Sequence, residues 1–471
     1  MRQTDRQTDR QTDRQTDRQT DRQTGGQASR ILALLLAFLM LTLTACGSST
    51  SSDSSDGGTS TKDDKETTSE AVDHINVYSF TDEVPGMLED YTKANNLPDD
   101  YFKVTIIATT DGAYQPALDE ALASGTVDIF CAEAAFIKKY VENEMTASYE
   151  ELGIDVAAET KAAGIAPYTI DVGSDANGVL KGLGYQATGG AFIYRRSLAK
   201  EVLGSDDPAT VAAAISDWDK FIDVARQMKA AGYAMVSGIG DVWHPLENSR
   251  AGKWVDEDNN LVLDPNVEKF FELAKTMKEE GLHNSTTDWA EAWFADMSGT
   301  GDRPCFGFFG PAWLINYTMK DNCGGTKEGE GTFGDWAVCA PTTGFYWGGT
   351  WVLASKETKA KAEVADIIRW ITLDASETGL QYTWASGDTV ASSEVMGKVD
   401  GHWDFLGGQD AFEVFVPAND AADGHTLSAY DERINTLFRD QVNLYAEGSK
   451  SKEQALEDFK SDVQDAFSEI K

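Results

Sequence analysis

Three short apolar segments, separated by stretches with helical spacing, constrain the fold of this chain more than any other feature. They are INVYSF (75–80), KVTIIAT (103–109) and VDIFCA (127–132), each rich in β-branched or aromatic residues. Between the second and third, apolar residues recur on one helix face until Gly125 ends the pattern. Strands that alternate with helices imply a parallel sheet covered on both faces. The sequence therefore predicts an α/β fold.

Acidic side chains follow each of these three strands. Asp82 and Glu83 come after the first, Asp111 after the second and Glu133 after the third. Ligands of parallel α/β sheets bind beyond the carboxyl ends of the strands, so these carboxylates are candidate ligand contacts. The alternative is that each one caps the N-terminus of the following helix, where an acidic side chain is also favourable.

A second αβ series follows a Gly-rich extended segment at 182–196, where the chain could cross between two lobes. Ser216 is a candidate cap for one helix, and Asp264, followed by Pro265, for another. The part of the chain after residue 75 exceeds one typical core and indicates two domains of ordinary size.

The N-terminal region carries a targeting signal. An apolar run at 31–43 is too short to cross a bilayer as a stable helix, and it leads into Leu43-Thr44-Ala45-Cys46. This pattern resembles the bacterial lipoprotein signal, which implies cleavage before Cys46 and attachment of a diacylglyceryl group to its sulfur. The alternative is a cleaved secretory signal with an incidental cysteine. We expect 1–45, with its RQTD repeat, to be removed and 46–74 to form a flexible tether.

Net charge and cysteine usage exclude several functions. A formal net charge of −38 opposes nucleic-acid binding and electrostatic docking on anionic lipid, so membrane contact is expected through the lipid anchor. Four further cysteines, Cys131, Cys305, Cys323 and Cys339, leave two possibilities open, namely one bridge among the last three or buried free thiols. The motifs predict no metal site and no cofactor.

The order of motifs carries a family resemblance. After the lipoprotein signal come INVYSF, VDIFCAEAAF, SDWDKFIDVARQMKAAG, FGPAWLINY and WGGTWVLAS. In this order they are similar to the extracellular solute-binding lipoproteins of carbohydrate ABC transporters, the maltose-binding-like family. The resemblance implies two discontinuous α/β lobes with a hinge, the type II periplasmic-binding-protein-like architecture. It implies crossings near 185–189 and 306–310, with 75–187 plus 308–355 in lobe 1 and 188–307 plus 356–471 in lobe 2.

The same resemblance implies aromatic ligand contacts at Trp243, Trp313, Trp347 and Tyr430, beside Asp82, Glu83, Asp111 and Glu133. The chemistry is consistent, because carboxylates accept hydrogen bonds from sugar hydroxyls and indoles stack on the apolar faces of sugar rings. Each aromatic residue has a core position as its alternative. Trp243 is expected in a loop, because it lies in the polar stretch GDVWHPLEN and on no periodic face. Many relatives carry an aromatic residue after the third strand where this chain has Cys131, Ala132 and Glu133, which leaves the identity of the sugar open.

The expected function is reversible capture of a sugar or oligosaccharide between the lobes and its delivery to ABC permease subunits. We expect a monomer without enzymatic activity, anchored by lipid at the outer face of the cytoplasmic membrane. Two alternatives remain. One is a receptor for a peptide, an amino acid or a polyamine. The other is a surface glycoside hydrolase that uses two carboxylates such as Asp82 and Glu133.

Overall fold

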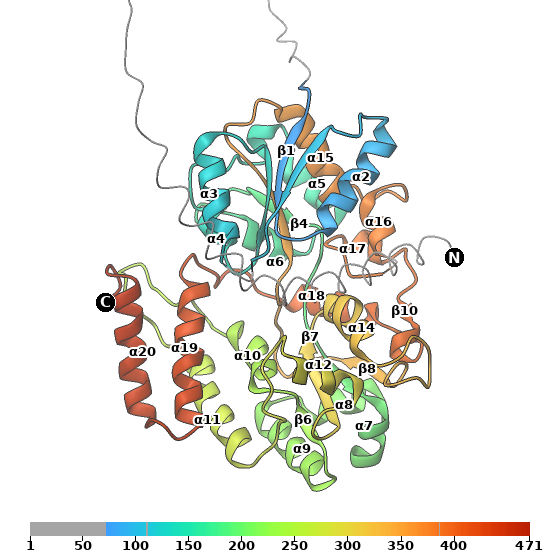
Figure 1. Ribbon diagram of the computed structural model, residues 1–471, viewed down its shortest axis with the longest axis vertical. Helices are drawn as coiled ribbons and strands as arrows, with labels where there is room; N and C mark the ends of the chain where they lie inside the picture. Colours follow the sequence, from blue (N-terminus) through green and yellow to red (C-terminus); the bar gives the residue numbers. More distant parts are fainter. Residues whose placement is uncertain (1–71, 110–111, 386) are drawn as a thin grey trace, which may run out of the picture. The chain divides into compact units, whose positions relative to one another are not determined.

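The computed structural model describes residues 72–109, 112–385 and 387–471 (Figure 1). The predicted signal region, Cys46 and the candidate contact Asp111 lie outside these residues. Within the described part of the chain, no helix has the length and apolar character needed to span a membrane.

The first lobe is built on a five-stranded sheet with the order β2-β1-β3-β9-β4. The three strands predicted from the opening apolar segments are present, and β1 pairs in parallel with β2 and β3. Two later strands extend the sheet in the antiparallel sense. The bounds are β1 Ile75–Ser79, β2 Phe102–Ile106, β3 Ile129–Glu133, β4 Gly182–Gly184 and β9 Thr350–Ala354.

Helices pack on this sheet as the periodicity predicts (Figure 1). The helix between the second and third strands ends at Gly125, whose φ of 66° gives the left-handed cap that glycine favours. The elements associated with this lobe are α2 Glu83–Asn95, α3 Tyr114–Ser124, α4 Ile137–Val141, η2 Glu150–Leu152, α5 Val156–Ala163, α6 Pro167–Gly173 and α15 Lys361–Thr372. Two short helices, α16 Leu380–Trp384 and α17 Ser393–Met396, follow in the connection to the second lobe.

The second lobe has a four-stranded sheet with the order β6-β7-β5-β8. The central strand β7 is buried along its whole length and pairs with β6 in parallel and with β5 in the antiparallel sense. The bounds are β5 Ala191–Arg195, β6 Ala234–Val236, β7 Cys305–Gly310 and β8 Trp336–Cys339; a separate ribbon pairs β10 His402–Trp403 with β11 Gln409–Asp410.

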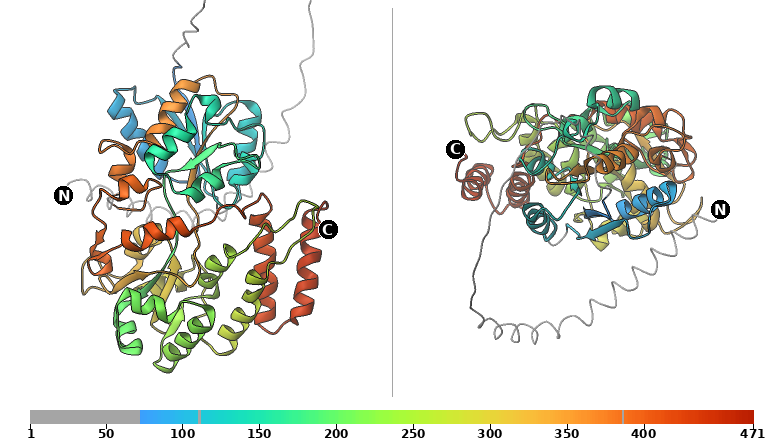
Figure 2. Two further views of the ribbon diagram at one scale, coloured as in Figure 1. Left: turned by 180° about the vertical axis from the view of Figure 1, so that it is seen from behind. Right: turned by 90° about the horizontal axis from the view of Figure 1, so that it is seen from above.

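Most of the remaining helices belong to this lobe. Asp264 caps one of them as predicted, whereas the cap expected at Ser216 falls one residue later, at Asp217. The two C-terminal helices α19 and α20 lie side by side (Figure 2). The elements are α7 Arg196–Leu203, α8 Pro208–Ala214, α9 Trp218–Ala230, α10 Ile239–Glu247, α11 Pro265–Glu279, α12 Glu291–Ser298, α13 Ala312–Leu314, η3 Ile315–Met319, α14 Lys320–Asn322, η4 Asp404–Leu406, α18 Phe412–Ala421, α19 Asp431–Ala446 and α20 Lys452–Ala466.

The division of the chain between the lobes differs from the expected one. Residues 308–355 were expected in lobe 1, but β7 and β8 pair with β5 in the second sheet. Conversely, α15 was expected in lobe 2, yet its buried face packs in the core of the first sheet. The second crossing accordingly lies between β8 and β9, and the segment expected there, 306–310, is a central strand.

Three chain segments run together where the lobes join. In the first crossing, Gln186 bridges Val390 and Gly189 bridges Tyr346. The amide of Trp347 donates to the carbonyl of Thr188 at 3.1 Å. This bundle of short backbone contacts is thin compared with the two sheets, which is the construction expected of a hinge.

The four cysteines of the folded body, Cys131, Cys305, Cys323 and Cys339, are buried free thiols. The bridge considered among the last three is therefore absent. Burial raises the pKa of Cys131 to about 12, so this thiol stays protonated.

Candidate functional site

A cluster of three tryptophans lies beyond the end of the second sheet. Trp313 opens the helix after β7, Trp347 lies in the second crossing, and Trp289 lies in the loop before α12. Trp289 and Trp313 are nearly parallel, at 7° and 6.0 Å between ring centroids. Trp347 meets Trp313 edge-on at 4.8 Å, and the indole N–H of Trp313 donates to the carbonyl of Trp347 at 3.0 Å. We call Trp289, Trp313 and Trp347 the ring cluster.

The ring cluster is partly open to solvent, unlike the tryptophans of the core. Trp289 is 53% exposed, and its φ of 66° is a left-handed conformation that a bulky residue rarely adopts. Such strain persists only where the surrounding structure holds it, and it occurs preferentially at ligand-binding sites. An exposed and strained tryptophan beside two others makes this surface a candidate for contact with an apolar ligand face.

A carboxylate of the first lobe faces this cluster. Glu133 ends strand β3, and Gly348 follows Trp347 in the second crossing. A Cβ placed on Gly348 would lie 3.6 Å from Oε1 of Glu133 and 3.7 Å from the indole of Trp313. Gly348 also has a φ of 66°, a left-handed conformation that glycine adopts without strain, so glycine suits this position for its backbone. Groups from the two lobes thus converge on one glycine.

The charge state of Glu133 reflects its surroundings. Its Oε2 accepts from the amide of Ala135 at 3.1 Å, and it takes part in none of the ion pairs found among the described residues. Burial, together with the charges of Glu247 and Glu432, raises the pKa of Glu133 to about 7. This side chain can therefore change between hydrogen-bond donor and pure acceptor near neutral pH.

Two further acids lie near the hinge. Glu83, the first residue of α2, accepts a hydrogen bond from the hydroxyl of Tyr185, and burial raises the pKa of Glu83. Burial also raises the pKa of Asp388 to about 8, although it accepts from the amide of Thr389 at 2.7 Å and from Gln186 at 3.2 Å. Carboxyl groups whose pKa is raised by burial are candidates for a functional role.

Two predicted contacts lie away from this convergence. Trp243 was expected in a polar loop, but it lies on α10 in the core, 1% exposed and packed between Phe270 and Phe438. Tyr430 precedes α19, packs edge-on against Phe467 at 5.0 Å and donates to Glu469. The prediction for Trp243 is wrong because burial of the α10 face outweighs the Gly and Pro residues that suggested a loop.

Asp82 lies at the N-cap position of α2. It is exposed, and its side chain makes no capping hydrogen bond to the helix backbone. The capping alternative is thus not realised for Asp82, and its role as a ligand contact stays a prediction.

Most of the residues that sequence reasoning missed lie away from the ends of the predicted strands. Trp289 follows the polar stretch NSTTD, and the residues that accompany it come from helix α10, the loop before α12, the first crossing and the third hinge segment. The missed residues are Trp289, His244, Asp288, Tyr185 and Asp388.

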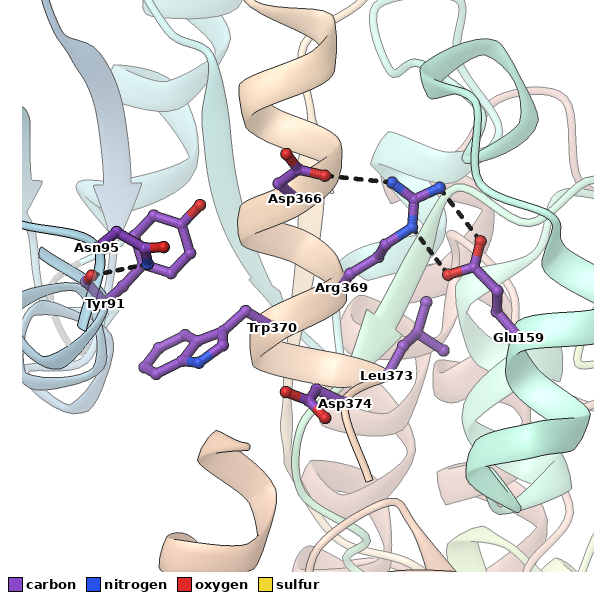
Figure 3. A pocket seen from close by; sticks show the side chains of 8 residues that line it. All are labelled: Tyr91, Asn95, Glu159, Asp366, Arg369, Trp370, Leu373 and Asp374. Carbon is purple, nitrogen blue, oxygen red and sulfur yellow. Dashed lines mark hydrogen bonds and ion pairs between the residues drawn. The ribbon is translucent and has the colours of Figure 1, made fainter. Parts of the chain in front are cut away.

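Two hollows lie away from this convergence. One, of about 470 Å³, is on the outside of the first lobe between α2, α5 and α15 (Figure 3). There Arg369 forms a two-point ion pair with Glu159 at 2.8 and 3.1 Å, while Trp370 turns to the other side and meets Tyr91 edge-on. The other hollow, of about 580 Å³, is polar and surrounds Arg196 and Gln409. Neither includes a residue of the ring cluster or Glu133.

Two lobes joined by three thin segments, with rings on one side and carboxylates on the other, define a two-lobed binding protein. Residues 86–394, more than half of the chain, match the family model of bacterial extracellular solute-binding proteins. The chain belongs to this family, which places it outside the cytoplasm. The comparison with curated proteins found no match.

Solved structures share the fold. An extracellular solute-binding protein of family 1 is 19% identical with a TM-score of 0.70, covering 83% of this chain and 99% of that one. The galacto-N-biose/lacto-N-biose I-binding protein of a Bifidobacterium longum ABC transporter is 16% identical, with a TM-score of 0.65 and coverages of 85% and 98%. The sugar-binding protein MalE of Xanthomonas citri is 14% identical, with a TM-score of 0.65 and coverages of 83% and 96%. At these identities the likeness confirms the predicted two-lobed fold.

Proposed function

We propose that this protein binds a sugar or oligosaccharide reversibly between its lobes and delivers it to the permease of an ABC transporter. The observation that carries the proposal is the convergence of Glu133 and Trp313 on Gly348. A sugar offers hydroxyls around its edge and apolar C–H groups on its faces, so it can use a carboxylate and an indole at the same time.

The relatives support the choice of ligand class. Solved structures with the same fold include proteins described as binding lacto-N-biose, β-1,6-galactobiose and acarbose. These ligands differ, while the architecture is shared. The proposal for this chain is accordingly a carbohydrate ligand, with the particular sugar set by its own ring cluster and carboxylates.

A ligand that touches both lobes stabilises the closed arrangement by its differential affinity for that state. In this proposal Trp289, Trp313 and Trp347 offer ring faces from the second lobe. Glu133, with Asp82 and Glu83, accepts hydrogen bonds from ligand hydroxyls on the side of the first lobe, and Asp111, which lies outside the described residues, stays a predicted contact. No bond of the ligand is broken, because reversible capture needs only binding and release.

The proposal extends to the N-terminal region. Lipidation of Cys46 would hold a monomeric protein at the outer face of the cytoplasmic membrane on a tether covering residues 46–74. Metabolic labelling with a fatty-acid analogue, compared between the wild type and Cys46→Ser, tests this part. Equal labelling of both proteins would contradict it.

Calorimetric titration with a panel of neutral oligosaccharides tests the ligand class. The panel includes β- and α-linked galactosides and glucosides, with polyamines and short peptides as comparisons. We expect saturable binding of at least one oligosaccharide and its recovery unchanged after incubation. Binding of only the amines or peptides, or release of monosaccharide, would overturn the proposal.

A further inference from the structure

The loop that carries Trp289 lies against the start of helix α10. The hydroxyl oxygens of Ser237 and Thr286 are 2.6 Å apart, and the amide of Thr286 donates to the carbonyl of Ser237 at 3.3 Å. On the other side of Trp289, the indole N–H of Trp293 donates to Oδ1 of Asp241 at 3.3 Å. The chain is therefore fixed to α10 both before and after Trp289.

Two glycines allow this close approach. A Cβ placed on Gly238 would lie 2.3 Å from the carbonyl oxygen of Thr286. A Cβ placed on Gly240 would lie 2.4 and 2.5 Å from the two carboxylate oxygens of Asp288 and 2.7 Å from its Cγ. Neither glycine has a left-handed backbone, so an alanine could adopt the same conformation at both positions. Glycine is needed here because of space and not because of conformation.

The contact between Gly240 and Asp288 accounts for an unusual buried atom. The Oδ1 of Asp288 is buried and has no hydrogen-bond partner among the described residues, while its Oδ2 lies 3.6 Å from Nε2 of His244. A buried polar atom of this kind calls for an explanation. The carboxylate lies against the first turn of α10, where the helix amides carry a partial positive charge that attracts it.

Asp288 directly precedes Trp289 in the chain, so this contact fixes the backbone that sets the direction of the Trp289 ring. Packing alone covers only about half of this ring, since Trp289 is 53% exposed. Its left-handed φ of 66° also needs support from the surrounding structure. The parallel alignment of Trp289 with Trp313, at 7° between planes, therefore depends on how the loop rests on α10.

We propose that Gly238 and Gly240 are positioning residues, a glycine seat on which the loop rests so that the ring of Trp289 is held ready for the ligand. This inference rests on the proposed function in one respect, because it takes Trp289 to contact the sugar. A larger side chain in the glycine seat displaces the loop and lowers affinity, although neither glycine belongs to the ring cluster.

Gly240→Ala tests the glycine seat by calorimetric titration with the sugar. All three atoms of the Asp288 carboxyl group lie within 2.7 Å of the new Cβ, so turning that group about its own bond cannot relieve the overlap. We expect the affinity to fall about tenfold, the contribution of one stacked ring. Alanine is the better helix former, so the loss cannot come from a weakened α10. Gly252→Ala, at an exposed position with open space around it, should bind like the wild type.

A double-mutant cycle with Asp288→Ala shows whether the two residues act through one contact. Asp288→Ala removes the carboxyl group that rests on Gly240, so it should weaken binding by itself. In that background Gly240→Ala should cost no further affinity, because the overlap is gone. A second loss of the same size in the double variant would overturn the inference, as would wild-type affinity in Gly240→Ala. Circular dichroism confirms that each variant is folded.

A ligand-free readout separates this inference from the proposed function. The indole N–H resonance of Trp289, assigned by its loss in Trp289→Phe, should shift in Gly240→Ala and keep its position in Gly252→Ala. An unchanged resonance in Gly240→Ala would overturn the glycine seat. If the resonance shifts as expected but no carbohydrate binds to the wild type, the proposed function fails and the positioning of Trp289 by the glycine seat stands.

Discussion

The two lobes differ in the side chains that they present where they meet. The second lobe presents rings, Trp289, Trp313 and Trp347, held by packing against one another and against His244. The first lobe presents carboxyl groups, above all Glu133, whose charge its surroundings oppose. A stacking surface needs a fixed ring orientation, whereas the hydrogen bonding of a carboxyl group changes with its protonation. The difference suggests that one lobe recognises the faces of the ligand and the other its edge.

A second contrast lies within one helix. Trp243 and His244 are neighbours on α10, yet the first packs between Phe270 and Phe438 and the second stacks on Trp347. Because successive helix residues point about 100° apart, one short helix can serve both the core and the ring cluster. The rings of the second lobe are therefore not equivalent, and only those at the sheet edge are assigned to the ligand.

The largest expected effect is a loss of stability on replacing Trp243, a tryptophan of the core. Trp243→Ala should lower the free energy of unfolding by about 3–5 kcal/mol, because it empties a fully buried site. Urea denaturation measures the loss, with Trp218→Ala at a partly buried position as a milder comparison. A stability close to the wild type would show that Trp243 is not the core residue described here.

Glu133 of the first lobe should make the stability of the folded protein depend on pH. Burial raises the pKa of Glu133 from 4.5 to about 7, so the folded state holds a proton that the unfolded state releases. Stability from this group is fully present below about pH 4.5 and falls as the pH rises to about 7, on the order of 3 kcal/mol in all. Urea denaturation at pH 5 and pH 8 should show a smaller difference in Glu133→Gln than in the wild type. An unchanged difference would mean that Glu133 ionises freely in the folded protein.

Removing a tryptophan of the ring cluster should lower the affinity for the sugar. Trp347→Ala should weaken sugar binding by about 1–3 kcal/mol, because a stacked face and its neighbours are lost together. Calorimetry gives the affinity, and Trp370→Ala, on the outside of the first lobe, is the matched control. Equal losses in the two variants would remove the special role of the ring cluster.

The smallest effect concerns Tyr430. Its ring packs on Phe467 and its hydroxyl reaches Glu469, so Tyr430→Phe should change sugar affinity by less than about 0.5 kcal/mol. A clear loss of affinity in the same titration would return Tyr430 to the binding surface and move that surface toward α19.

Periodicity was sufficient to predict the local elements. The strands near 75, 103 and 127 and the helix ended by Gly125 follow directly from apolar spacing and a glycine cap. Which of the two lobes a strand joins depends on contacts with residues that are distant in the sequence. The segment Cys305–Gly310 is buried throughout, and such a segment carries no alternation that would tell one sheet from another.

The site was predictable only where it follows a strand. Glu133 was found because it ends β3, and Trp313 and Trp347 were found through the family resemblance. Trp289 lies in a polar loop, and nothing local distinguishes it from a surface residue. His244 and Asp288 are 44 positions apart in the chain and meet only because α10 and the loop before α12 pack together.

The central claim is that one carbohydrate is held by both lobes at once. Calorimetric titration of the same sugar into the wild type, Trp347→Ala and Glu133→Gln tests this directly, with circular dichroism to confirm that each variant is folded. The account predicts that each variant binds at least several-fold more weakly than the wild type, since each removes the contribution of one lobe. An affinity that depends on Trp347 but is unchanged in Glu133→Gln at pH 8 would contradict it, because the ligand would then be held by the second lobe alone.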